Sequence, residues 1–293
     1  MKYPVIVGTD LTEASDDALI QAEARATRDE TAITVVHAMS PLLWGAVNDA
    51  DYVERLRELI RRQFTALTGR REDEYEVVVE RGLAHAVLAR LAVPQRALLV
   101  VGSHMHHGVG HALLRDITER VVERARGPVL VTRPCNASNR ILVAVDRSFN
   151  TSVALDVAID EARSSDSKLT VLHSIDTGVM QTLAADIFNG GAYADHSLGQ
   201  HSRMVETRQA LRTELRRRHA EADVHVVEGE AQSLIPQVAA RIEAELVVVG
   251  TAHRPAPTPH VTTAVLRHAP CSVLVVDDGS TLAAHSSLQM NPI

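Results

Sequence analysis

Short apolar runs rich in β-branched residues alternate along the chain with segments whose apolar residues recur at helical spacing. In the first half the apolar runs are Val5–Val7, Ile33–Val36, Val77–Val79, Leu98–Val101 and Val129–Thr132. Because they do not alternate with polar residues, they predict strands buried on both faces, as in a parallel sheet. The helical stripes between them span Ala18–Ala26, Leu56–Leu67, Val87–Leu91 and Ile117–Ala125. Five strands with four intervening helices predict a doubly wound, Rossmann-like α/β domain.

The same pattern occurs a second time, which indicates a duplication. Matching blocks pair Val5–Asp10 with Ile141–Asp146, Val35–His37 with Val171–His173, Val79–Gly82 with Val226–Gly229, Leu99–Gly102 with Val247–Gly250, and Val129–Val131 with Val273–Val275. The chain of 293 residues therefore divides into two tandem five-stranded domains at 1–136 and 139–278, followed by a flexible tail at 279–293. An insertion after His173 is rich in apolar residues and is expected to cover the second sheet.

Composition excludes several classes of protein. The formal net charge of −7 and a total of eight aromatic residues argue against nucleic-acid binding. No apolar run approaches the roughly 20 residues that span a bilayer, and the first residues form no apolar signal region. Two cysteines, Cys135 and Cys271, cannot form a disulfide framework, which predicts a cytoplasmic protein.

Several loop motifs resemble the universal stress protein family in its tandem form. They are Val7–Ser15, Val35–His37 and Val100–Ser103 with Glu119–Val121 in the first copy, and Val143–Asp146, Val171–His173, Val249–Thr251 and Leu266–Cys271 in the second. The resemblance extends from Val5 to Asp277. It implies a module of stress adaptation that either binds ATP or dimerises without nucleotide.

Members of the nucleotide-binding branch carry a loop of the form G-x-x-G, nine residues, then G-S/T, whose glycines turn backbone amides toward the phosphates. In the first copy this loop starts at Gly102, but Met105, Arg115 and Asp116 replace the other motif residues, and Ile117 follows. A left-handed Met105 would cost roughly 1–2 kcal/mol. A carboxylate at Asp116 about 4 Å from a phosphate would cost about 4 kcal/mol at an effective dielectric of 20. Arg115 is the counterargument, because it supplies a cation.

Ligands of such sheets bind beyond the carboxyl ends of the strands. The cofactor-binding candidates there are Asp10, Ala38, Gly102, Met105, Arg115, Asp116 and Ile117 in the first copy, and Asp146 and Gly250 in the second. The resemblance implies that Asp10 lies against the adenosine part of ATP; the alternative is that its carboxylate caps the following turn. In the second copy the loop is shorter and carries three prolines, which remove amide donors.

A histidine cluster in the first loop offers a different chemistry. His104, His106, His107 and His111 are candidate metal ligands, since imidazoles bind zinc, copper or nickel. The alternative is that basic residues of a surface loop have been exchanged for histidine.

The sequence contains no catalytic triad order, no paired carboxylates at loop ends and no Walker-type lysine, so no enzyme is expected. The hypothesis that fits best is a stress-response module that acts by binding an unknown protein partner and requires no cofactor. One alternative is an ATP-binding switch that uses the first domain, and a further one is a metal-binding protein. The two copies are expected to form an intramolecular pseudo-dimer through Val129–Arg133 and Ser272–Asp277, whose strands would otherwise leave open edges; a homodimer is a further possibility.

Overall fold

The computed structural model describes residues 2–39, 50–103, 117–134, 137–146, 152–175, 193–251 and 260–277, and only the backbone of residues 117, 193–201 and 260. The chain forms two compact units. The first comprises Met1–Asn136, Thr251–Pro259 and Cys271–Ile293, and the second comprises Ala137–Gly250 and His260–Pro270. The expected cover over the second sheet and the expected tail fall largely outside the described residues.

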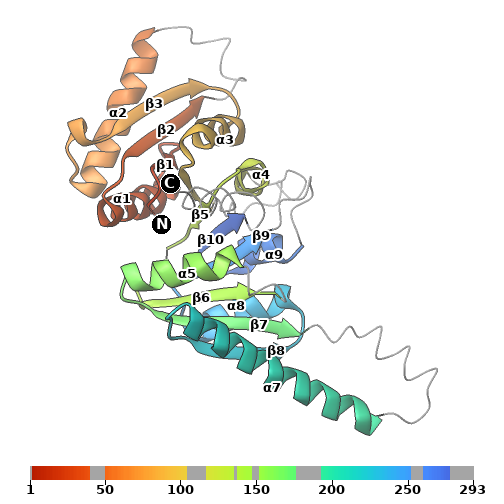
Figure 1. Cartoon of the computed structure of the whole chain (residues 1–293). Coiled ribbons are helices and arrows are strands. Elements are labelled where there is room, and N and C mark those ends of the chain that lie inside the picture. The colour runs from red at the N-terminus through yellow and green to blue at the C-terminus, as the bar shows by residue number, and fades with distance from the viewer. Residues whose placement is uncertain are drawn as a thin grey trace, which may run out of the picture. The chain divides into compact units, whose positions relative to one another are not determined.

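The first unit is a twisted sheet with helices on both sides (Figure 1). Its strands are β1 (Val5–Gly8), β2 (Ile33–Met39), β3 (Glu76–Arg81), β4 (Leu98–Gly102), β5 (Val129–Thr132) and β10 (Ser272–Asp277), in the order β3-β2-β1-β4-β5-β10. Its helices are α1 (Asp16–Asp29), α2 (Ala50–Thr68), α3 (Ala84–Gln95) and α4 (Ile117–Arg124), with short 3-10 turns at Glu13–Ser15 and Glu72–Glu74. Strands β1 to β5 pair in parallel, and β10 pairs with β5 in antiparallel orientation.

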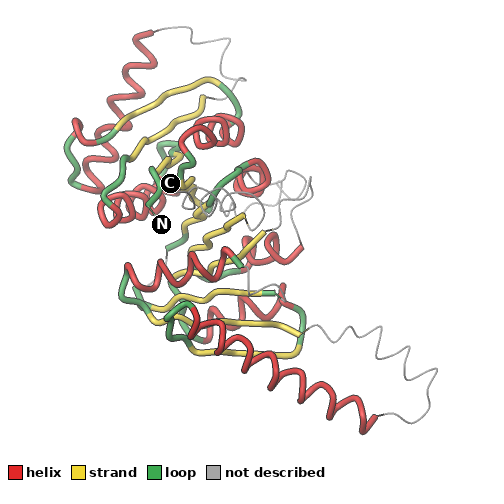
Figure 2. Tube along the Cα trace, in the orientation of Figure 1, coloured by secondary structure: helices red, strands yellow, loops and turns green. Residues whose placement is uncertain are grey.

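The second unit repeats this arrangement of helices and parallel strands (Figure 2). They are β6 (Arg140–Val145), β7 (Lys168–Ile175), β8 (Asp223–Glu228) and β9 (Leu246–Thr251), in the order β8-β7-β6-β9. The helices are α5 (Val153–Ser164), α7 (Tyr193–Arg217), α8 (Ala231–Arg241) and α9 (His260–His268). The predicted alternation of strands and helices is therefore confirmed in both copies.

Burial follows the hydrophobic pattern with one correction. Every residue of β4 and β5 is buried, as expected for strands with helices on both faces. The prediction that Val77–Val79 are equally buried is wrong, because all three valines of β3 are only half-buried. The reason is position, since β3 is the outermost strand of its sheet.

Among the described helices, none combines the length and apolarity needed to cross a membrane.

The last strand of the chain belongs to the sheet of the first unit. Val273 lies opposite Val131 and Leu274 opposite Leu130. Buried polar groups continue this pairing, because the Arg133 amide donates to Ser272 Oγ at 3.1 Å and Ser272 Oγ donates to Gln21 Oε1 at 2.9 Å. The sequence repeat placed β10 with the second domain, whereas in the structure this strand covers the edge that β5 would otherwise expose.

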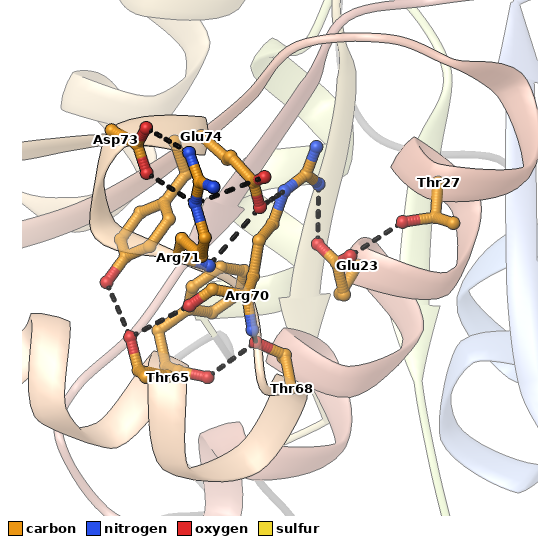
Figure 3. A network of polar contacts seen from close by, with 10 residues as sticks. Glu23, Thr27, Thr65, Thr68, Arg70, Arg71, Asp73 and Glu74 are labelled. Carbon is orange, nitrogen blue, oxygen red and sulfur yellow. Dashed lines mark hydrogen bonds and ion pairs between the residues drawn. The ribbon is translucent and has the colours of Figure 1, made fainter.

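A polar network fastens the end of α2 to its neighbours (Figure 3). Arg70 Nη1 donates to Glu23 Oε2 of α1 at 2.7 Å, and Thr65 Oγ1 donates to the Arg70 carbonyl at 3.1 Å. The hydroxyls of Thr65 and Tyr75 share a hydrogen bond of 3.1 Å, and the rings of Phe64 and Tyr75 meet edge to face at 4.6 Å. Helix α2 is thereby held against α1 and against the residue that precedes β3.

Phe64→Ala is expected to destabilise the first unit by about 3–5 kcal/mol, because the side chain is fully buried and contacts Tyr75. Urea denaturation followed by circular dichroism measures this change. Leu59→Ala is the matched control, since Leu59 lies on the same helix and is 50% exposed. Equal effects of the two substitutions would contradict the described packing of α2.

Candidate functional site

The carboxyl ends of β1, β2 and β4 meet at a cavity of about 310 Å³ in the first unit. Its lining residues are Gly8, Thr9, Asp10, Ser15, Val36, His37, Ala38, Gly82, Leu83, Ala84, Leu88, Val101, Gly102 and Thr118. The structure thus brings together three of the predicted site residues, namely Asp10, Ala38 and Gly102. The cavity lies where parallel α/β sheets place their ligands.

Asp10 caps the turn that follows β1. Its Oδ1 accepts hydrogen bonds from the Thr12 amide at 3.0 Å and from Thr12 Oγ1 at 2.7 Å. This is the turn geometry that aspartate favours when it hydrogen-bonds the backbone two residues ahead. These hydrogen bonds cap the turn, and they hold an exposed carboxylate at the rim of the cavity.

Thr9 fixes the loop between β1 and α1 from inside. Its buried hydroxyl lies 2.9 Å from Ser15 Oγ, donates to Gln63 Oε1 at 3.2 Å and accepts from the Leu11 amide at 3.0 Å. Gln63 in turn donates from Nε2 to Asp16 Oδ1 at 2.8 Å. Leu11 adopts a left-handed conformation, with φ of 66°, within this network.

His37 and His173 support the strand ends in the same way in both copies. His37 Nδ1 is 2.9 Å from the carbonyl oxygen of Thr9, and His173 Nδ1 is 2.9 Å from that of Val145. Because a carbonyl only accepts, each ring carries its proton on Nδ1 in this contact. Both histidines therefore brace the end of the neighbouring strand, which fits a role in the fold.

Gly102 is required by a close approach of two backbone segments. A Cβ atom at this position would lie 2.8 Å from the carbonyl oxygen of Ala14. A Cβ at Gly8 would instead meet Leu88 of α3, so the two glycines face opposite sides of the sheet. Thr118 of α4 donates from Oγ1 to the Gly102 carbonyl at 3.4 Å, which links the end of β4 to the next helix.

The start of α3 forms a wall of the cavity that sequence reasoning missed. Gly82 has a φ of 146°, Leu83 is 53% exposed, and Ala84 begins the helix. The available signal was the repeat itself, because Gly82 and its counterpart Gly229 both end the third strand with positive φ. The repeat identified Gly82 but did not indicate that the next residues, Leu83 and Ala84, line the cavity.

His85, the second residue of α3, is buried with only 4% of its surface exposed. Burial, followed by the charges of Arg124 and Arg120 on α4, holds the pKa of His85 below its ordinary value. This buried histidine directly follows Ala84, which lines the cavity.

The remaining candidates are not brought to this cavity by the described structure. Met105, Arg115, Asp116, His104, His106, His107 and His111 lie outside the described residues, and Ile117 is described only as the backbone start of α4. In the second unit Asp146 follows β6 and is exposed, while Gly250 lies near the end of β9. Within the described ranges, no group of three or more histidine, cysteine or acidic side chains is placed to hold a metal ion.

Comparisons with known proteins agree with this geometry. The sequence profile of the universal stress protein family matches residues 2–133 and 138–277. A universal stress protein of Staphylococcus saprophyticus is 28% identical over 141 residues, which are 46% of this chain and 81% of the relative. The stress response protein NhaX of Bacillus subtilis is 29% identical over 133 residues, covering 39% of this chain and 80% of that protein.

A solved universal stress protein from Archaeoglobus fulgidus superposes with a TM-score of 0.65 at 18% identity, covering 94% of this chain and 97% of the other. A similar structure from Pseudomonas aeruginosa gives a TM-score of 0.64 at 19% identity, covering 94% and 93%. These likenesses show that the tandem α/β fold is shared.

Gly102→Ala is expected to destabilise the first unit by about 1–3 kcal/mol, because the new Cβ would be forced against the Ala14 carbonyl. Thermal unfolding measures the change. Gly127→Ala serves as the control, since its Cβ would meet the nearest atom at an ordinary 3.5 Å. If Gly102→Ala is as stable as Gly127→Ala, the close approach at the end of β4 is not present in solution.

Proposed function

Because the chain belongs to the universal stress protein family, we propose that it is a cytoplasmic stress-response module that acts through a protein partner and not by catalysis. In this proposal the first unit binds the nucleoside part of a nucleotide and holds phosphate groups poorly. The observation that carries the proposal is the cavity at the ends of β1, β2 and β4.

The size and lining of the cavity favour a nucleoside. Its volume of about 310 Å³ lies at the lower end of the roughly 300–1,000 Å³ of small-molecule sites. Val36, Leu88 and Val101 supply apolar walls that suit a flat ring, while Thr9 and Asp10 supply oxygen atoms. An exposed aspartate at the rim suits the hydroxyl groups of a sugar, because a carboxylate accepts hydrogen bonds.

The sequence of the following loop disfavours a triphosphate. Met105 stands where the phosphate loop of the nucleotide-binding branch has glycine, and Asp116 stands where it has serine or threonine. A carboxylate near a phosphate is repelled by about 4 kcal/mol at 4 Å and an effective dielectric of 20. This loss supports a site that prefers adenosine or a monophosphate to ATP.

The two repeats are proposed to act as an intramolecular pseudo-dimer. The pairing of β5 with β10 supports this proposal, because the two strands come from different repeats. The prolines in the loop after Gly250 leave fewer amide donors for an anion. Ligand binding is therefore assigned to the first repeat.

Isothermal titration calorimetry with adenosine, AMP and ATP tests which of these compounds the first unit binds. One adenosine site is expected, with ATP bound more weakly. Ala38→Leu should abolish binding because the larger side chain fills the cavity, and Asp10→Ala should weaken it. Asp146→Ala is the matched control from the equivalent place in the second copy and should leave binding unchanged. Absence of binding by all three compounds, or an equal effect of Asp146→Ala, would rule out the proposed site.

Restoring the glycine and serine of the phosphate loop should change the relative affinity for ATP and adenosine. The double variant Met105→Gly with Asp116→Ser is expected to raise the affinity for ATP about tenfold or more, since it removes the like-charge repulsion and restores a glycine that lets backbone amides turn toward the phosphates. Adenosine affinity, measured in the same titrations, should stay constant and serves as the control. An unchanged affinity for ATP would show that the loop does not limit phosphate binding.

A further inference from the structure

His85 is a buried residue of α3, and both α3 and its neighbour α4 contribute to the cavity wall. The preceding residue on α3, Ala84, lines the cavity. On α4, Thr118 lines the same cavity and donates to the Gly102 carbonyl. Helices α3 and α4 pack against each other. A change in the charge of His85 therefore acts on the packing of two helices that enclose the site.

The charges around His85 come mainly from α4. The elements packed against α3 are β1, β2, β4 and α4. Strands β1 and β4 carry no titratable side chain, and β2 carries His37. Helix α4 carries Glu119, Arg120, Glu123 and Arg124, of which the two arginines act against a charged His85. On α3 itself, Arg90 is paired with Glu80 of β3.

The backbone adds a third unfavourable contribution to a charged imidazole. His85 is the second residue of a twelve-residue helix, so it lies at the positive end of the helix dipole. The N-cap residue, Leu83, makes no side-chain hydrogen bond to this helix end. Burial, the two arginines and the dipole all favour the neutral ring, and each of them would oppose its protonation.

We propose that His85 is an acid-sensitive latch: its neutral ring lets α3 and α4 pack, and its protonation drives the two helices apart and opens the cavity wall. The part of this inference that concerns ligand release rests on the function proposed above. The latch itself concerns only the helices and is tested without any ligand.

The sign of the effect follows from linkage. In the unfolded or opened state His85 has its ordinary pKa of about 6.5, whereas the folded state lowers it. At about pH 7.5 and above both states are largely unprotonated, so packing is little affected. As the pH falls below about 6.5, the open state takes up the proton first, and the closed state loses stability until the pH is below its lowered pKa.

Hydrogen–deuterium exchange of the full chain, with peptides that cover α3 and α4, tests the latch at about pH 7.5 and about pH 5.5 after correction for intrinsic rates. His85→Gln keeps a neutral polar side chain at both values. The ratio of wild-type to variant protection in α3 and α4 should fall severalfold on acidification. All other histidines are shared by the two proteins, so their titration cancels in this ratio.

Two further variants secure the interpretation. His268→Gln removes an exposed histidine of α9 and should behave as the wild type. Arg124→Gln changes an exposed residue, so the protein should fold, and it should reduce the acid-induced loss of protection because it removes one charge that opposes His85. If α3 and α4 lose as much protection on acidification in His85→Gln and in Arg124→Gln as in the wild type, the latch is wrong.

Adenosine titrations at the same two pH values then test the coupling to the site. Wild-type affinity should fall severalfold at about pH 5.5, while His85→Gln should retain its affinity. If adenosine fails to bind at about pH 7.5, the proposed function fails and the exchange experiment still decides the latch. If adenosine binds and both proteins lose affinity equally on acidification, His85 does not control the site.

Discussion

The close approach of the Gly102 backbone to the Ala14 carbonyl is the constraint on which the site depends. Because a side chain at this position would lie 2.8 Å from that oxygen, only glycine lets the loop after β1 come so near the end of β4. The same loop carries Thr9, whose hydroxyl holds it from within, and Asp10, whose carboxylate closes its turn. The cavity lies where three parallel strands end together, and residues of this loop line it.

The two copies preserve their fold in the same way and differ in their loops. His37 and His173 brace the neighbouring strand at identical distances of 2.9 Å, and Gly82 and Gly229 make the same left-handed exit from the third strand. The loops after the fourth strands have diverged instead, with histidines in one copy and prolines in the other. Strand ends are restricted by sheet geometry, whereas a loop changes its chemistry without disturbing the sheet.

Much of the fold could be predicted from the sequence, because buried parallel strands and helical stripes leave strong patterns. The half-burial of Val77–Val79 could not, since an apolar run does not reveal which strand lies at the edge. At the site, Asp10, Ala38 and Gly102 were found from their places at strand ends, but the wall formed by Leu83 and Ala84 was not. Such a wall depends on how a helix packs across the sheet, and single-sequence patterns carry no record of that packing.

In the functions proposed for this cavity, its lining links ligand binding to the acid response of His85. Its walls come from α3 and α4 as well as from the strands, and helices shift relative to each other more readily than hydrogen-bonded strands do. A ligand that contacts both helices favours their closed packing, and a charge that separates the helices weakens the binding of that ligand by the same free energy. Under the proposed latch, the buried His85 of α3 couples acidity to the occupancy of the cavity through the packing of α3 and α4.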